Sequence, residues 1–97
     1  MTPETSSSAT ALLRALAHPL RLQIVEQLSE HDHRCVHELV DALGAPQPTV
    51  SQHLQVLRAA RLVEGRRVGK EVRYSLTDHH VSHIVLDAIA HAQESTT

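Results

Sequence analysis

The spacing of apolar residues changes twice along the chain, and this change constrains the fold more than any other feature of the sequence. Up to residue 60, apolar side chains recur every three or four positions, which is the period of an amphipathic helix. Between residues 62 and 76 the period becomes two, because Val72, Tyr74 and Leu76 alternate with polar residues. A helical period returns after residue 78. The chain is therefore predicted to fold as helices interrupted by one pair of strands.

Proline and glycine mark where these elements begin and end. Pro19 suits the first turn of a helix, and it pushes His18 out of the helical conformation, so one helix ends and another begins there. Gly44 provides a helix stop, and Gly69 lies at the bend between the two strands. The predicted helices cover about residues 9–17, 19–29, 36–43, 48–60 and 79–93, and the strands cover 62–69 and 70–76. Thr77 or Asp78 is the candidate N-cap of the last helix.

A chain of 97 residues has room for one hydrophobic core. The two helices at 36–43 and 48–60 are short and joined by a tight turn, which is the helix-turn-helix arrangement, and the hairpin after them forms a wing. We predict a mainly α (α+β) fold, a winged helix-turn-helix with the order α-α-α-α-β-β-α. The domain is expected over residues 9–94, with flexible tails at 1–8 and 95–97.

Several classes of protein are disfavoured by what the sequence lacks. No apolar run approaches the roughly 20 residues that span a bilayer, and the first ten residues do not resemble a secretory signal. Cys35 is the only cysteine, so no intrachain disulfide can form, which suits a reducing compartment. Nucleophile–base pairs, phosphate-binding glycine loops and HExxH motifs are also absent. We expect a cytoplasmic protein with no membrane partner, no enzymatic activity and no small organic substrate.

The net charge of −2 conceals a basic segment between two acidic ones. Residues 47–74 carry six basic and two acidic side chains, whereas the segments on either side each have a net charge of −3. In the helix at 48–60, an inward stripe of Val50, Leu54 and Leu57 leaves polar side chains pointing outward, where they can hydrogen-bond base edges in the major groove. Residues at the start of this helix and on the hairpin are placed for phosphates. The predicted DNA-binding residues are Gln47, Thr49, Ser51, Gln52, Gln55, Arg66, Arg67, Lys70 and Arg73.

Each of these features alone would also fit a solvated polar face beside a charged edge strand. Their combination on a helix-turn-helix followed by a basic hairpin favours double-stranded DNA as the partner.

The last helix carries candidate metal ligands at both ends. Asp78 and His80 lie at its start, and His91 and Glu94 at its end. His80 and His91 are eleven residues apart, which is about 16 Å along a helix, too far to share one ion. Two copies of the helix packed antiparallel in a homodimer would bring the start of one helix to the end of the other. The resulting set of two imidazoles and two carboxylates suits Zn²⁺ and tolerates Co²⁺ or Ni²⁺.

A second group of candidate ligands lies between residues 31 and 38. Cys35, His37 and Glu38 could form a second metal site, with His31 and His33 nearby. The alternative is a reduced cysteine beside a solvated loop. His18 and His53 are interpreted as structural residues.

The sequence resembles the ArsR/SmtB family of bacterial metal-responsive repressors over nearly its whole length. The segments ALAHPLR and VSQHLQVLRAARLV are typical of the family's fold, and the motif Asp78-x-His80-x10-His91-x2-Glu94 matches the intersubunit site of its zinc sensors. The resemblance implies a homodimer that binds a palindromic operator when metal-free and releases it when zinc bridges the C-terminal helices. It also implies a hydrogen bond from His91 to a backbone carbonyl near Arg61, and derepression of metal efflux or sequestration genes.

Other readings of the same residues stay open. The repressor could sense nickel or cobalt, which prefer higher coordination and would recruit His79 or His83. The last helix could instead serve only as a dimer interface in a metal-independent regulator, or in a redox regulator that responds through Cys35.

Overall fold

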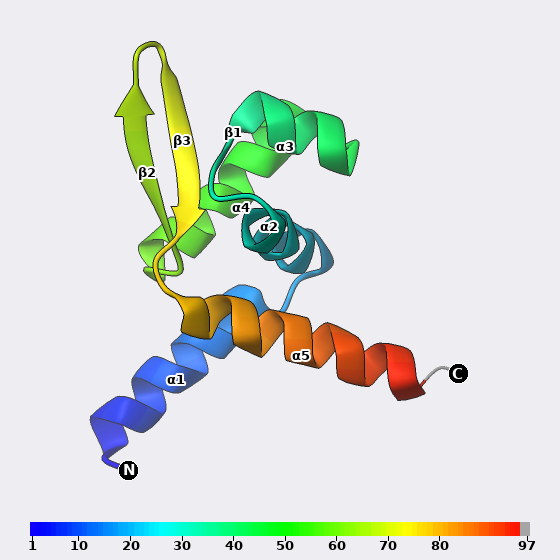
Figure 1. Ribbon diagram of the computed structural model, residues 1–97. Helices are drawn as coiled ribbons and strands as arrows, with labels where there is room; N and C mark the ends of the chain where they lie inside the picture. The colour runs from blue at the N-terminus through cyan, green and yellow to red at the C-terminus, as the bar shows by residue number, and fades with distance from the viewer. Residues whose placement is uncertain (96–97) are drawn as a thin grey trace.

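A computed structural model describes residues 1–95 and confirms the winged helix-turn-helix (Figure 1). The elements in chain order are α1 (Pro3–Leu16), α2 (Pro19–Glu30), β1 (Arg34–Cys35), α3 (Val36–Leu43), α4 (Gln47–Ala59), β2 (Val63–Val68), β3 (Glu71–Leu76) and α5 (His79–Ser95). The helix-turn-helix is formed by α3 and α4, and the wing is the β2–β3 hairpin, which extends away from the helices.

Two elements differ from the sequence-based expectations. The first helix begins at Pro3 instead of Ala9, so residues 3–8 are helical and do not form the expected tail. Thr2 caps this helix, because its hydroxyl oxygen accepts the backbone N–H of Thr5 at 3.2 Å. Apart from Pro3, residues 3–8 have only polar side chains, so no hydrophobic period could reveal the helix. Of the tail expected at 95–97, Ser95 ends α5, and residues 96–97 lie outside the described part of the chain.

The second difference is β1, a two-residue strand that the sequence analysis did not predict. It pairs antiparallel with β3, so the sheet has the order β1-β3-β2 and β3 is its central strand. A strand of two residues has no measurable period, which explains why it was missed. Because β1 leads directly into α3, this pairing attaches the helix-turn-helix to the wing.

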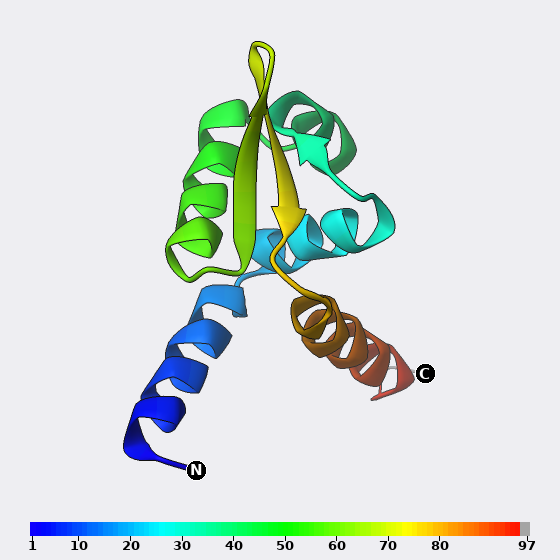
Figure 2. The ribbon, with the colours of Figure 1, turned by 60° about the vertical axis from the view of Figure 1, so that its left-hand side comes forward.

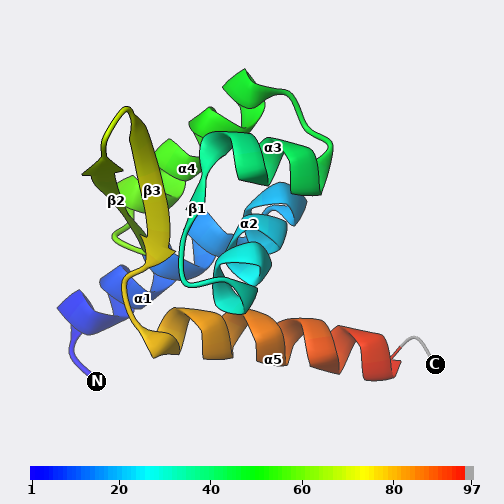
Figure 3. The same ribbon diagram turned by 45° about the horizontal axis from the view of Figure 1, so that its top comes forward.

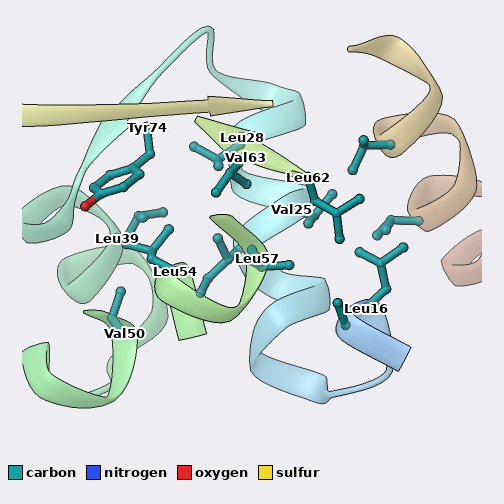
Figure 4. Packing of buried hydrophobic residues seen from close by; sticks show 14 residues of the cluster. Leu16, Val25, Leu28, Leu39, Val50, Leu54, Leu57, Leu62, Val63 and Tyr74 are labelled. Carbon is teal, nitrogen blue, oxygen red and sulfur yellow. The ribbon is translucent and has the colours of Figure 1, made fainter. Parts of the chain in front are cut away.

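The core joins α2, α3, α4 and the base of the wing (Figure 4). The predicted stripe of Val50, Leu54 and Leu57 on α4 is confirmed, since all three are at most 1% exposed. Tyr74, the only aromatic residue of the chain, packs its ring from β3 toward Leu39. Each fully buried aliphatic side chain contributes about 1.5–3 kcal/mol, so this cluster fixes how α4 and the wing are held relative to each other.

The helices α1 and α5 lie at the end of the molecule opposite the tip of the wing (Figures 2 and 3). Only one side of each helix contacts the core, through Ala15 and Leu16 on α1 and through Val81 and Val85 on α5. Apolar side chains remain exposed on both helices, among them Leu13, Ile84 and Leu86. Within residues 1–95, no helix is long and apolar enough to cross a membrane.

Candidate DNA interface and metal-binding helix

The helix α4 presents a polar face to solvent. Gln52 and Gln55 are exposed and lie three residues apart, so their side chains are neighbours on the helix surface. Ser51 is half-buried at the edge of this face. Amide groups donate and accept hydrogen bonds, as base edges in the major groove require. The arrangement therefore gives α4 the properties of a recognition helix.

The N-terminus of α4 has backbone N–H groups available for phosphate. The N-cap is Pro46, which offers no side-chain acceptor, and the first N–H groups of a helix have no partner within it. Gln47 is exposed and Thr49 half-buried in this first turn. The positive end of the helix dipole and these donors favour an anion at this place.

The basic residues of the wing do not share one surface. The register pairs Arg66 with Arg73 and Arg67 with Val72, so Arg66 and Arg73 project from one face of the hairpin. Arg67 projects from the opposite face, on which Tyr74 packs into the core. Lys70 lies in the turn at the tip. A DNA duplex can therefore meet these cations from either side of the wing, and they do not form a single patch.

Arg73 differs from the other cations of the wing because it has partners within the chain. Its Nη1 atom lies 3.1 Å from Nδ1 of His33, and its Nη2 atom lies 3.6 Å from a carboxylate oxygen of Glu71. Arg66, Arg67 and Lys70 are exposed, and none of them makes an ion pair with another described residue. These three side chains are therefore the cations best placed to bind phosphate. The contact with His33 could not be predicted from the sequence, because it depends on the unexpected pairing of β1 with β3.

Asp78 is the N-cap of α5, which settles the choice between Thr77 and Asp78. Its Oδ1 atom accepts the backbone N–H groups of His80 at 2.9 Å and Val81 at 3.3 Å. The second carboxylate oxygen, Oδ2, takes part in neither bond and can face a ligand. Asp78 thus fixes the start of the helix and holds a carboxylate oxygen beside His80.

The four predicted metal ligands fall into two pairs at the two ends of α5. Asp78, His80, His91 and Glu94 are all exposed. The eleven residues between the histidines correspond to about 16 Å of helix. Among residues 1–95, no three His, Cys, Asp or Glu side chains come together as a ligand group. Each pair can therefore supply half of a metal site, and two imidazoles with two carboxylates fit zinc if the other half comes from a second chain.

The residues of the second candidate metal site are used in the local structure of α3. Glu38 Oε1 accepts the backbone N–H of Cys35 at 3.0 Å, and its other oxygen lies 3.3 Å from Arg34 Nη1. The hydrogen bond from Cys35 is the main reason why the pKa of Glu38 is lowered. Cys35 itself is 6% exposed, whereas His37 is exposed. These contacts explain Cys35 and Glu38 without a metal ion.

His18 and His53 lie against each other at the junction of α2 and α4. Their ring centroids are 4.3 Å apart, and His18 Nδ1 accepts the backbone N–H of Leu20 at 3.1 Å, which caps α2. Burial is the main reason why the pKa of His53 is lowered, and electrostatic interactions with His18 and Arg21 lower it further. The contacts are consistent with the interpretation of both histidines as structural residues.

Taken together, the polar recognition helix and the basic wing define a winged helix-turn-helix DNA-binding domain. Residues 18–65 match the family model described as "Bacterial regulatory protein, arsR family". The chain belongs to this family, whose members it resembles in both sequence and structure. It is a DNA-binding transcriptional regulator and not an enzyme.

The similarity to a curated relative is high. The HTH-type transcriptional repressor SmtB of Mycobacterium tuberculosis (strain ATCC 25618 / H37Rv) is 63% identical over 91 residues, which cover 94% of this chain and 67% of the relative. This chain thus spans about two thirds of the length of that repressor.

Two solved structures have the same fold. The homodimeric winged helix-turn-helix domain Mb0332 from Mycobacterium bovis aligns with a TM-score of 0.85 and 27% identity, covering 99% of this chain and 91% of that domain. The AntR antimony-specific transcriptional repressor aligns with a TM-score of 0.86 and 25% identity, covering 98% of this chain and 86% of the other.

Proposed function

We propose that the protein is a zinc-responsive transcriptional repressor. The metal-free homodimer binds operator DNA, and zinc held between paired α5 helices lowers the affinity for DNA. Transcription of genes for metal efflux or sequestration then resumes. The observation that carries this proposal is the pair of ligand groups, Asp78 with His80 and His91 with Glu94, at the two ends of one exposed helix.

The second chain that completes each site is a copy of the same protein. Leu13 is 54% exposed, Ile84 37% and Leu86 41%, so α1 and α5 carry apolar side chains that association of two copies would bury. On a helical wheel Ile84 lies about 40° from His80, so apolar contact and ligands share one face. A twofold axis between antiparallel α5 helices creates two equivalent sites. The homodimeric structure of the Mycobacterium bovis neighbour supports this assembly.

In the proposed site, Asp78 and His80 of one protomer face His91 and Glu94 of the other. Zinc would supply a bond between the two protomers at each end of the helix pair. Oδ1 of Asp78 accepts the two hydrogen bonds that cap α5, so Oδ2 is the oxygen available to the ion. His80 and His91 would bind the ion through neutral imidazole nitrogens.

Zinc changes DNA binding only if it favours one dimer geometry over another. In a dimer, the two α4 helices must fit successive major grooves about 34 Å apart. Gln52 and Gln55 are the proposed base contacts, Gln47, Thr49 and Ser51 support them at the helix start and edge, and Arg66, Arg67, Lys70 and Arg73 contact phosphates. A small change in the angle between the protomers is sufficient to misplace one of the two helices.

The proposal is tested with a fluorescein-labelled duplex that the metal-free protein selects from a random-sequence library. Fluorescence anisotropy then measures the DNA affinity with and without zinc for wild type, His80→Ala and His91→Ala. His37→Ala is the matched control, because His37 is an exposed histidine outside α5. We expect zinc to weaken DNA binding in wild type and in the control only. A zinc effect that survives both α5 substitutions would overturn the proposal.

A second candidate is the same repressor responding to nickel or cobalt. The observation that favours it is His83, which is exposed one turn after His80 and could raise the coordination number. The absorption spectrum of the cobalt-loaded protein separates the two candidates, because tetrahedral cobalt absorbs far more strongly than octahedral cobalt. Sensing of oxidants is disfavoured, because Cys35 is buried and the chain has no second cysteine.

A further inference from the structure

Thr77 connects the end of the recognition helix to the start of the metal-binding helix. Its hydroxyl donates to the carbonyl oxygen of Arg61 at 3.0 Å and also lies 3.3 Å from that of Leu62. Its backbone N–H donates to the Leu62 carbonyl at 3.2 Å. The segment that carries Thr77, between β3 and α5, passes beside the turn that ends α4 (Figure 1). Residues sixteen positions apart are thereby joined through one side chain.

The turn on the α4 side of this connection is strained. Arg61 has a φ of 61°, and within residues 1–95 it is the only residue other than glycine with a positive φ. Its N–H donates to the Arg58 carbonyl at 3.0 Å and the N–H of Leu62 to the Leu57 carbonyl at 2.9 Å, which closes α4 by a Schellman motif. Glycine usually occupies the position of Arg61 in this motif. A side chain persists in such a conformation only when its surroundings hold it, and Thr77 contributes to that restraint.

On the other side, Thr77 directly precedes Asp78. The Asp78 carboxylate caps α5 and is one of the proposed zinc ligands. A displacement of Asp78 would therefore be transmitted through one residue, Thr77, to the carbonyl oxygens of Arg61 and Leu62 just after the end of α4. Arg61 and Leu62 in turn position the last turn of α4, since their N–H groups bond to its final carbonyls.

We propose that Thr77 is a positioning residue that couples the metal-binding end of α5 to the recognition helix. The inference rests on the proposed function, because it needs zinc at Asp78. It is distinct from the hydrogen bond of His91 that the family resemblance implies. His91 lies about 18 Å along α5 from His79, whereas Thr77 already donates to the Arg61 carbonyl within one protomer.

The test compares Thr77→Val, Thr77→Ser and Ser82→Ala with wild type. Valine has the shape of threonine without the hydroxyl donor, and serine keeps the donor. Ser82→Ala is the matched control, because it removes another hydroxyl near the start of α5 that donates only to the His79 carbonyl, at 2.9 Å. Competition with a chromophoric chelator measures the zinc affinity, and anisotropy with the selected duplex measures the ratio of DNA dissociation constants with and without zinc.

We expect Thr77→Val to reduce this ratio about tenfold, within the usual range of allosteric coupling, while the zinc affinity changes less than about threefold. Thr77→Ser and Ser82→Ala should keep the wild-type ratio. Amide hydrogen exchange at Arg61 and Leu62 in the metal-free protein should be faster in Thr77→Val than in the other three proteins, whereas exchange within α4 and α5 should be the same in all four. This combination would show that the turn has loosened while the helices remain folded.

The outcomes separate this inference from the proposed function. A wild-type ratio near one would overturn the proposed function, and the role of Thr77 with it. A wild-type response to zinc that Thr77→Val retains in full would overturn the role of Thr77 alone. Equal losses of the ratio in Thr77→Val and Thr77→Ser would also overturn it, because the hydroxyl would then not be the coupling group.

Discussion

Replacing Gly65 by alanine tests how tightly the wing is packed on the core. Gly65 lies on β2 directly opposite Tyr74. A Cβ atom at this position would lie 3.0 Å from Cγ1 of Val72 and 3.1 Å from Cε1 of Tyr74. Carbon atoms in ordinary contact are about 3.5–4.0 Å apart, so one of the two side chains must move. Tyr74 cannot move freely, because its ring is buried in the core.

The expected loss of stability follows from two opposing effects. Overpacking of a tight site costs about 1–3 kcal/mol. Alanine recovers about 0.5–1 kcal/mol relative to glycine, because it has less backbone entropy to lose in a strand. The free energy of unfolding should therefore fall by up to about 2.5 kcal/mol. In a domain of this size that corresponds to a decrease in Tm of up to about 20 °C.

Urea unfolding at one fixed protein concentration measures this change, since the stability of the proposed dimer would depend on concentration. Gly69→Asn is the control, because Gly69 has no atom near its missing Cβ and asparagine tolerates its positive φ of 64°. A double-mutant cycle with Val72→Ala identifies the cause. If the added Cβ clashes with Val72, Val72→Ala should lower the free energy of unfolding by at least about 0.5 kcal/mol less when residue 65 is alanine than when it is glycine. Additive effects, or a gain in stability from Gly65→Ala, would refute the reasoning.

Three further predictions concern the two binding regions and the histidine pair. Asp78→Asn should keep the helix cap, whereas Asp78→Ala should lower the free energy of unfolding in urea by about 1 kcal/mol. Both variants should bind zinc more weakly in competition with a chelator. Equal free energies of unfolding for the two variants would contradict the capping role of Asp78. Burial lowers the pKa of His53 in the folded protein. As the pH falls below about 6.5, the histidine is therefore protonated in the unfolded chain before it is protonated in the folded protein. The free energy of unfolding should fall in this pH range by at most about 1.4 kcal/mol per pH unit. His53→Gln should reduce the difference in the free energy of unfolding between pH 7.5 and pH 5.5. If the difference is unchanged, the pH dependence of stability arises from other groups. Gln52→Ala and Gln55→Ala should each cost about 1–3 kcal/mol of operator binding, with an unchanged salt dependence. Arg66→Ala or Lys70→Ala should instead lower the salt slope by about one, as anisotropy titrations at several salt concentrations would measure.

Much of the fold could be predicted because its elements have a clear hydrophobic period. The stripe of Val50, Leu54 and Leu57 identified α4 and its outward face, and alternation identified the hairpin. Apart from Pro3, the first turns of α1 contain only polar side chains, and β1 is too short to have a period, so neither was predicted. Tertiary pairing, and not local sequence, creates β1.

The candidate sites were predictable to a different extent. The rise of a helix shows that His80 and His91 cannot share an ion in one chain, and the structure has them at the two ends of α5. Alternation along β2 already implies that Arg66 and Arg67 face opposite sides, but the pairing with β3 was needed to identify the side that meets the core. The bond from Thr77 to Arg61 could not be predicted, because no local pattern links residues sixteen positions apart.

The central claim is that each metal site is shared by two chains, and mixing two inactive variants tests it most directly. His80→Ala and His91→Ala each disrupt both sites of their own homodimer. In a mixed dimer, one site combines both substitutions and the other keeps Asp78 and His80 from one chain with His91 and Glu94 from the other. Unfolding and refolding an equal mixture should therefore restore about one quarter of the wild-type tetrahedral cobalt absorption, since half of the dimers are mixed and each has one intact site. An absorption after mixing that equals the mean of the two separate variants would contradict the account.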